Sequence, residues 1–150
     1  MRALIQRVSR ASLTVGELHT GTMGRGLVVL LGVGHEDERA DADWLAGKIS
    51  ELRLFPDASG LMNLSVLDMG GDVMMVSQFT LFAQTRKGRR PGFTGAARPE
   101  EAKPLWEYFY TTMEALLGKS IILGEFGADM KIELVNDGPV TIWIDTKNKE

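Results

Sequence analysis

The chain has 150 residues, enough for one domain with a buried core, and its 44% hydrophobic and 25% charged residues are ordinary for a globular protein. No apolar run approaches the length of a membrane helix and the first residues lack the apolar stretch of a signal peptide, so we expect a cytoplasmic protein without membrane partners. The absence of cysteine excludes disulfides and a cysteine nucleophile, and the net charge of −3 argues against a protein that coats nucleic acid such as DNA non-specifically.

The first half of the chain predicts three strands and a helix. Residues 2–15 are rich in apolar and β-branched positions and end at Gly16, which indicates a long strand, and a shorter strand follows over 17–23. Residues 27–33 form a continuous apolar run, which predicts a strand buried on both faces. Residues 38–52 carry apolar side chains at helical spacing and acids at their start, so they predict an amphipathic helix.

The middle of the chain predicts a turn, a strand and a loop before a second helix. The turn covers 56–60, the strand covers Asp72–Phe82, and the loop over 83–97 is long, basic and glycine-containing.

The second helix is expected to begin near Pro99 and to stop at Gly118. Pro104 either kinks this helix or marks its true start. Four residues at helical spacing are expected to face the core: Leu105, Phe109, Met113 and Leu116.

The last part of the chain predicts strands near 120–126, 130–136 and 140–146. Together the elements indicate a single α+β domain over residues 1–150, with a mainly antiparallel or mixed sheet that curls toward a barrel, and two amphipathic helices. A regular alternation of strands and helices is missing, which argues against a doubly wound fold.

Two short patterns resemble cofactor or metal sites, and we expect neither function. Gly32-Val33-Gly34 follows a strand as in a dinucleotide fingerprint, but Asp37 stands where the third glycine is needed and its charge would repel a pyrophosphate. The adjacent residues His35 to Glu38 start a helix and would rarely converge on one ion, so they are interpreted as helix-start charges. The chain is therefore expected to use no cofactor and no metal.

A cluster of four cations, Arg86, Lys87, Arg89 and Arg90, lies within five residues of the long loop. Such a cluster can hold a polyanion at one place on an acidic protein. On charge alone, a solvated surface loop is an equal alternative.

The segment Ser77-Gln78-Phe79-Thr80 carries the first candidate site. Hydroxyls, an amide and an aromatic ring follow an apolar strand where a plain core strand would prefer aliphatic residues. The alternative is a strand whose polar face meets water. No Gly-x-Ser-x-Gly elbow occurs, and the two histidines, His19 and His35, lie far from this segment in sequence.

The segment Asn136-Asp137-Gly138-Pro139-Val140-Thr141 carries the second candidate site. Its composition is also typical of a hairpin turn, although a two-residue hairpin would not need the proline. A Gly-Pro bond permits the cis form, and the sequence leaves its state open.

These two segments resemble the signature motifs of the D-aminoacyl-tRNA deacylase family, Ser-Gln-Phe-Thr and Asn-x-Gly-Pro-x-Thr, at every specified position. The similarity extends over nearly the whole chain. It includes Gln6-Arg7-Val8, the apolar run with Gly32-Val33, Arg53-Leu54-Phe55, Lys87–Ala97, Phe126-Gly127-Ala128 and the total length. Gly92 departs from the family, whose members often have serine there.

The resemblance implies a homodimeric hydrolase that cleaves D-amino acids and glycine from tRNA. It implies that Gly138 and Pro139, flanked by Asn136 and held outward by Arg7, enter the partner subunit's pocket and exclude L-amino acids. Backbone N–H groups of Phe79 and Thr80 would stabilise an oxyanion while the ribose 2′-hydroxyl assists the attack.

The resemblance also implies roles for three further groups of residues. Ser77 and Gln78 complete the catalytic motif; Phe93, Ala96 and Ala97 line the pocket; and the loop cations meet tRNA phosphates. Three alternatives stay open: an esterase with a Ser77 or Thr80 nucleophile, a non-catalytic RNA-binding module, and a free-standing editor of another specificity.

Overall fold

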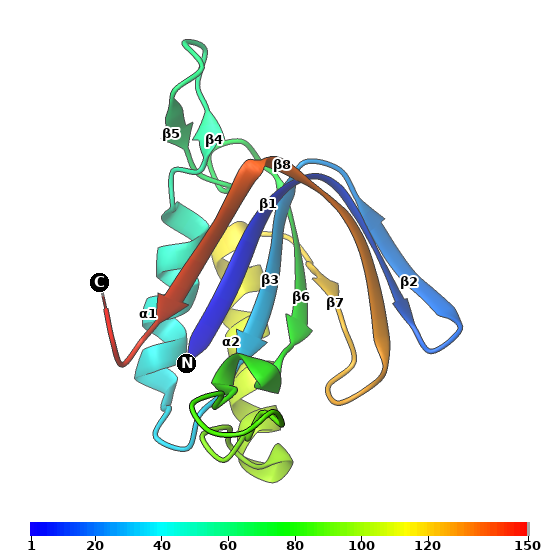
Figure 1. Cartoon of the computed structure of the whole chain (residues 1–150). Coiled ribbons are helices and arrows are strands. Elements are labelled where there is room, and N and C mark those ends of the chain that lie inside the picture. The colour runs from blue at the N-terminus through cyan, green and yellow to red at the C-terminus, as the bar shows by residue number, and fades with distance from the viewer. Residues whose placement is uncertain (150) are drawn as a thin grey trace.

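The computed structural model describes residues 1–149 and consists of a curved sheet, a small hairpin and two helices (Figure 1). The elements in chain order are β1 (Arg2–Val15), β2 (Leu18–Met23), β3 (Gly26–Gly32), α1 (Arg39–Glu51), β4 (Phe55–Pro56), β5 (Met62–Leu64), β6 (Asp72–Ser77), the 3₁₀ helix η1 (Phe79–Phe82), α2 (Pro99–Leu117), β7 (Ile122–Leu123) and β8 (Met130–Asp145). No helix within these residues is both long and apolar enough to cross a bilayer.

The main sheet is mixed, in the order β2-β1-β3-β6-β7, with β8 paired to the other side of β1. β1 is antiparallel to β2, β3 and β8, whereas β3 and β6 are parallel, as are β6 and β7. The long strands bend, so that β2 comes back toward β7 (Figure 1). An added Cβ at Gly21 of β2 would lie only 3.1 Å from Ile122 Cγ2 of β7. The expected α+β domain with a mixed sheet nearly closed into a barrel is therefore confirmed.

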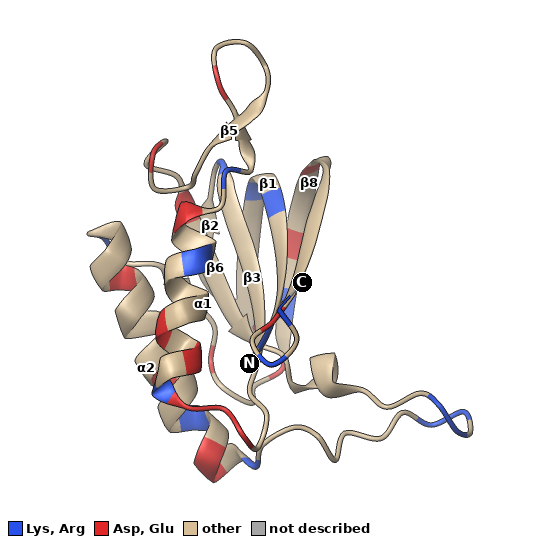
Figure 2. Cartoon of the chain, turned by 90° about the vertical axis from the view of Figure 1, so that its left-hand side faces the viewer, with Lys and Arg blue, Asp and Glu red and all other residues tan. Residues whose placement is uncertain are grey.

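Both helices cover one face of the sheet (Figures 1 and 2). Alternate residues of the strands point toward them, as the two-residue period of a strand requires. The resulting core includes Ile5 of β1, Val29 of β3, Ile49 of α1 and Phe109 of α2, all fully buried. A second, smaller core fills the inside of the curl.

Both predicted helices are present. Glu38 caps α1, exchanging hydrogen bonds with Asp41 in a capping box. α2 begins at Pro99, continues through Pro104 and ends at Gly118, whose φ of +67° closes the helix in the left-handed conformation. Pro104 is therefore not the start of the helix.

The expected core stripe of α2 is partly wrong. Phe109 and Met113 are buried, but Leu105 is only partly buried and Leu116 is exposed. Ala102 and Trp106 take the inner positions instead, because the buried face of α2 is centred closer to these two residues than the predicted stripe is.

Three strand predictions need correction. β6 ends at Ser77, so the predicted strand over Asp72–Phe82 is too long, and the strand near 120–126 is reduced to two residues. The two strands predicted over 130–136 and 140–146 are one strand, β8. It stays paired with β1 on both sides of an irregular segment, so that segment is not a hairpin turn.

Candidate active site

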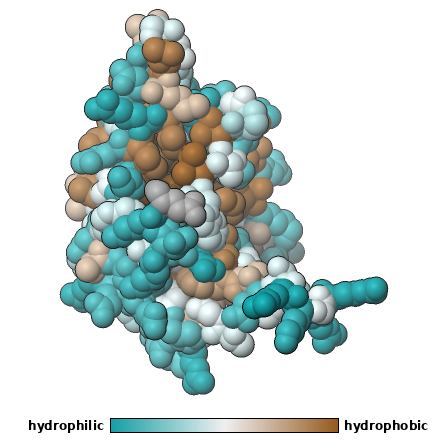
Figure 3. All heavy atoms as spheres, turned by 60° about the vertical axis from the view of Figure 1, so that its left-hand side comes forward, coloured by the Kyte–Doolittle hydropathy of each residue, from teal (hydrophilic) through white to brown (hydrophobic). Residues whose placement is uncertain are grey.

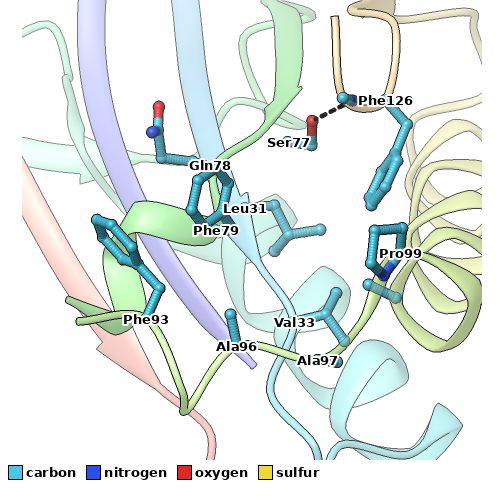
Figure 4. A pocket seen from close by; sticks show the side chains of 12 residues that line it. Leu31, Val33, Ser77, Gln78, Phe79, Phe93, Ala96, Ala97, Pro99 and Phe126 are labelled. Carbon is cyan, nitrogen blue, oxygen red and sulfur yellow. Dashed lines mark hydrogen bonds between the residues drawn. The ribbon is translucent and has the colours of Figure 1, made fainter. Parts of the chain in front are cut away.

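A pocket of about 360 Å³ opens where β3 and β6 end, beside the first turn of α2 (Figure 4). Its walls are mostly apolar or aromatic, and no ionisable side chain of residues 1–149 lines it. The lining residues are Leu31, Val33, Ser77, Gln78, Phe79, Phe93, Ala96, Ala97, Pro99, Ala102, Phe126 and Gly127. A mostly apolar hollow of this size is typical of a small-molecule site.

The predicted segment Ser77–Thr80 lies at the rim of this pocket. The Gln78 N–H donates to Leu31 O (2.7 Å), which extends the β3–β6 pairing by one residue before the chain turns into η1. The Gln78 side-chain amide then donates to the Thr80 hydroxyl. Ser77, Gln78 and Phe79 line the pocket, while Thr80 lies just beyond the lining.

Phe82, at the end of η1, explains the Gly32-Val33-Gly34 pattern. An added Cβ would lie 3.0 Å from the Phe82 ring at Gly32 and 2.8 Å from it at Gly34. The two glycines therefore give the ring room against the end of β3, which fixes the place of η1 at the pocket.

The predicted wall residues Phe93, Ala96 and Ala97 line the same pocket. The Ala97 N–H donates to Val33 O at 2.9 Å, so this segment is attached to the end of β3. Phe93 and Phe79 meet edge to face with ring centroids 5.1 Å apart, and together they form one side of the opening (Figure 4). Phe79 remains 57% exposed, so its ring is available to a ligand.

The four cations Arg86, Lys87, Arg89 and Arg90 lie on a loop that projects far from the body of the protein (Figure 2). Two backbone hydrogen bonds between Gln84 and Gly92 close the base of the loop, directly before Phe93. All four side chains are exposed, and none forms an ion pair with a residue in 1–149. The loop thus extends its four positive charges from the pocket wall into solvent.

Gly138 and Pro139 lie in the irregular segment of β8, where four residues of β8 stand opposite Arg7 alone. Their peptide bond is cis, and both residues are exposed. The buried Arg7 guanidinium donates to Asp137 O (2.8 Å) and to Leu54 O (2.5 Å). The Asn136 side chain closes the segment by donating to Val140 O and accepting from Val140 N–H.

Within one chain this segment and the pocket are at opposite ends of the sheet. β1 pairs Arg7 with Leu27 at one end and Arg2 with Gly32, beside the pocket, at the other. Five residues of strand separate these pairs, which is about 17 Å. The structure therefore brings Ser77–Phe79 together with Phe93, Ala96 and Ala97, but does not bring Gly138 or Arg7 to them.

Comparison with known proteins gives the family. The family model described as D-Tyr-tRNA(Tyr) deacylase matches residues 4–145. The chain belongs to the D-aminoacyl-tRNA deacylase family. It is 51% identical to a D-aminoacyl-tRNA deacylase of Bacteroides thetaiotaomicron and 55% identical to one of Opitutus terrae, each over 150 residues that cover both proteins completely.

Two solved structures resemble this deacylase fold. The c-Myc DNA unwinding element binding protein superposes with a TM-score of 0.91 at 39% identity, covering 97% of this chain and 98% of that one. A probable eukaryotic D-amino acid tRNA deacylase superposes with a TM-score of 0.82 at 16% identity, over 95% and 97% of the two chains, which supports the fold alone.

Sequence reasoning missed half of the deacylase pocket. Leu31, Val33, Pro99 and Ala102 read as core or helix-start residues, because apolar wall residues carry no chemical signal of their own. Phe126-Gly127 stands out in the sequence only through the family resemblance; the Gly127 N–H lies 3.5 Å from the Ser77 hydroxyl and joins that loop to the motif (Figure 4).

The acidic segment before α1 is engaged in structural contacts. Asp37 is buried and accepts from the Gly34 N–H, and it forms an ion pair with the Met1 amino group. Burial lowers the pKa of that amine, while Asp37 opposes the shift. No group of three or more His, Asp or Glu side chains within residues 1–149 is placed to hold a metal ion.

Proposed function

We propose that this chain hydrolyses the ester between a D-amino acid, or glycine, and the terminal adenosine of tRNA, and that it leaves L-aminoacyl-tRNA intact. Family membership makes it a D-aminoacyl-tRNA deacylase, an ester hydrolase. The observation that carries the finer proposal is the pocket, in which the Ser77–Thr80 motif borders an apolar hollow without ionisable groups. Aminoacyl-tRNA as the substrate agrees with the cytoplasmic location expected from the sequence, which stays a prediction.

The pocket suits the terminal adenosine. A purine is flat and largely apolar on its faces, and the Phe79 and Phe93 rings at the opening offer aromatic surfaces for stacking. Ser77 and Gln78 add polar atoms that can meet the ribose or the ester. In this arrangement the ester lies at the start of η1.

Catalysis in this pocket is proposed to work by positioning. With no ionisable side chain in the lining, the ribose 2′-hydroxyl of the substrate assists the attack on the ester carbonyl. Phe79 and Thr80 open η1, where the first N–H groups have no partner inside the helix, and we assign to them the stabilisation of the oxyanion. The Thr80 hydroxyl accepts from Gln78, and no histidine or carboxylate of residues 1–149 is hydrogen-bonded to it to activate it as a nucleophile.

The chiral filter is proposed to come from a second copy of the chain. Gly138 and Pro139 are exposed and their carbonyl groups can accept from the α-ammonium of a substrate held in the partner's pocket. With the ammonium fixed there, an L side chain would meet backbone and a D side chain would point to open space. Glycine has no side chain to exclude. Asn136 and Arg7 hold the segment in place.

The sheet offers a surface for this dimer. On the face away from the helices, Leu4, Leu30 and Trp143 are only partly buried or exposed, because their strand neighbours point toward the helices. An apolar area is visible between the β4–β5 hairpin and the basic loop (Figure 3). A two-fold axis through such a face would carry the Gly138 end of one copy to the pocket end of the other.

The basic loop is proposed to contact acceptor-stem phosphates. Its cations are exposed and joined directly to the pocket wall at Phe93, so they can position tRNA without reading its sequence. The name of one structural relative refers to DNA binding by that protein. For this chain we keep tRNA as the partner, no DNA, and no cofactor or metal.

The direct test is deacylation of matched D- and L-tyrosyl-tRNA and of glycyl-tRNA by the purified protein. We expect release of D-tyrosine and glycine with L-tyrosyl-tRNA essentially intact, and equal rates on the two enantiomers would reject the proposal. A trapped acyl adduct on Ser77 or Thr80 would favour a nucleophilic esterase. Binding without hydrolysis would favour an RNA-binding module, and preference for another L-aminoacyl-tRNA would favour a different editor.

A further inference from the structure

His35 stands between two walls of the pocket, although it does not line the pocket itself. Its Nε2 lies 3.0 Å from the carbonyl oxygen of Thr94, and its Nδ1 lies 3.5 Å from Oε2 of Glu101. These partners are 59 and 66 residues further along the chain. The fold therefore places an oxygen atom beside each ring nitrogen: Nε2 carries the hydrogen that is donated to Thr94 O, and Nδ1 pairs with Glu101 when the ring is protonated.

The two partners belong to different parts of the pocket wall. Thr94 follows Phe93 and precedes Ala96 and Ala97 in the loop that forms one wall. Glu101 lies in the first turn of α2, between Pro99 and Ala102, which form another. A single side chain thus connects the loop, the start of α2 and the end of β3.

The loop has few other attachments on this side. Backbone contacts join Gly34 to Ala96 and Val33 to Ala97, and the Thr94 hydroxyl donates to Gln84 at 3.1 Å. None of these contacts reaches α2. Between Phe93 and Ala96, the side chain of His35 connects the backbone of the loop, at Thr94, to the end of β3 and the start of α2.

We propose that His35 is a positioning residue of the deacylase: it holds the Phe93–Ala97 loop against α2 and so sets the width of the pocket that receives the terminal adenosine. The inference rests on the function proposed above. An imidazole N–H donating to a carbonyl fixes the place of that carbonyl, and each donor of this kind contributes modestly when its partner is near solvent. The expected consequence is weaker binding at the adenosine end, with the chemical step left intact.

The geometry also argues against a metal role for the His35–Glu38 segment. Nε2 of His35 faces a carbonyl oxygen, to which only an N–H group can hydrogen-bond, so this nitrogen has no lone pair for a metal ion. Asp37 points away into its contacts with Gly34 and Met1.

The test compares His35→Ala with His19→Ala, since the chain has two histidines. His19 is exposed on β2, and within residues 1–149 its ring is hydrogen-bonded to the Thr22 hydroxyl alone, so its variant controls for loss of an imidazole. Two measurements are made: calorimetric affinity for an amide-linked, non-hydrolysable D-tyrosyl-adenosine analogue, and single-turnover deacylation of D-tyrosyl-tRNA at increasing enzyme concentration. Because the small analogue has no acceptor stem, its affinity measures binding in the pocket without a contribution from the basic loop.

We expect His35→Ala to weaken analogue binding about three- to tenfold and to raise the half-saturating enzyme concentration equally, with the maximal rate within about twofold of the wild type. At least one of His35→Gln and His35→Asn, which keep a side-chain N–H, should recover most of the affinity. His19→Ala should match the wild type.

The inference is overturned if His35→Ala binds the analogue as well as His19→Ala does, or if neither amide variant recovers affinity. It is also overturned if the maximal rate falls while affinity is kept. A wild-type protein that fails to deacylate D-tyrosyl-tRNA would instead reject the proposed function, so the two failures are distinguishable.

Discussion

Replacement of Gly138 by alanine is the sharpest test of the β8 segment. Gly138 has a φ of +148°, and an added Cβ would lie 2.7 Å from Val140 Cγ2, 2.8 Å from Val140 N and 3.1 Å from Arg7 Nη2. The backbone conformation alone costs an L-residue about 1–3 kcal/mol. The Val140 nitrogen belongs to the backbone, so a change of rotamer cannot relieve that overlap, and the segment must shift. We expect Gly138→Ala to lower the free energy of unfolding by about 2–4 kcal/mol in total.

The matched control is Gly60→Ala in the turn between β4 and β5. Gly60 also has a positive φ, +83°, but no atom lies within 4 Å of the place that a Cβ would take there. This variant should lose only the conformational term, about 1–2 kcal/mol. Urea denaturation measures both losses, and deacylation of D- and L-tyrosyl-tRNA measures the filter. We expect Gly138→Ala to lose most deacylation of D-tyrosyl-tRNA while Gly60→Ala keeps it. Equal stability and equal D-to-L selectivity in the two variants would refute the reasoning.

Three further predictions concern the loop, the motif and the assembly. Changing Arg89 and Arg90 to alanine should weaken tRNA binding and flatten its dependence on log salt by about one unit per lost contact; an unchanged slope would make the loop ordinary surface. Thr80→Ala should keep activity within roughly tenfold of the wild type, which is about 1.4 kcal/mol of barrier. A 3′-charged tRNA that ends in 2′-deoxyadenosine should bind normally and be hydrolysed far more slowly. If Thr80→Ala instead loses several orders of magnitude in rate, Thr80 is a nucleophile. Sedimentation should give a mass near twice the 16.5 kDa of one chain. Leu4→Glu on the open sheet face should reduce this mass, while Leu18→Glu at an exposed position of β2 should not. A stable, active wild-type monomer would contradict the shared filter.

The elements predicted well are those whose pattern is local. The run at 27–33 and the helical spacing over 38–52 depend on neighbours a few residues away, and both elements lie where expected. The turn after Ser77 depends on Leu31 O and on the space left by Gly32 and Gly34, which are more than 40 residues distant. Alternation within the segment could not reveal that β6 stops there.

The Asn136–Thr141 segment also depends on residues that are distant in the sequence. Asn, Asp, Gly and Pro together indicate a hairpin when two strands would otherwise pair with each other. Here both halves of β8 pair with β1 instead, and β1 is long enough to accept both. The chemical residues of the site were found from motifs, whereas wall residues such as Val33 and Ala102 were not, because only the fold distinguishes an apolar wall from an apolar core.

The uncharged lining of the pocket has a consequence for how the rate of hydrolysis depends on pH. Because no side chain in residues 1–149 that lines the pocket titrates, the walls themselves have no protonation state to lose when the surroundings become more acidic. One group that does titrate inside the pocket is the α-amine of the bound aminoacyl ester, and a free α-amino group changes charge at about pH 8. Apart from the His35–Glu101 pair outside the lining, the dependence of the rate on pH is therefore expected to follow the amino acid attached to the tRNA rather than the pocket walls.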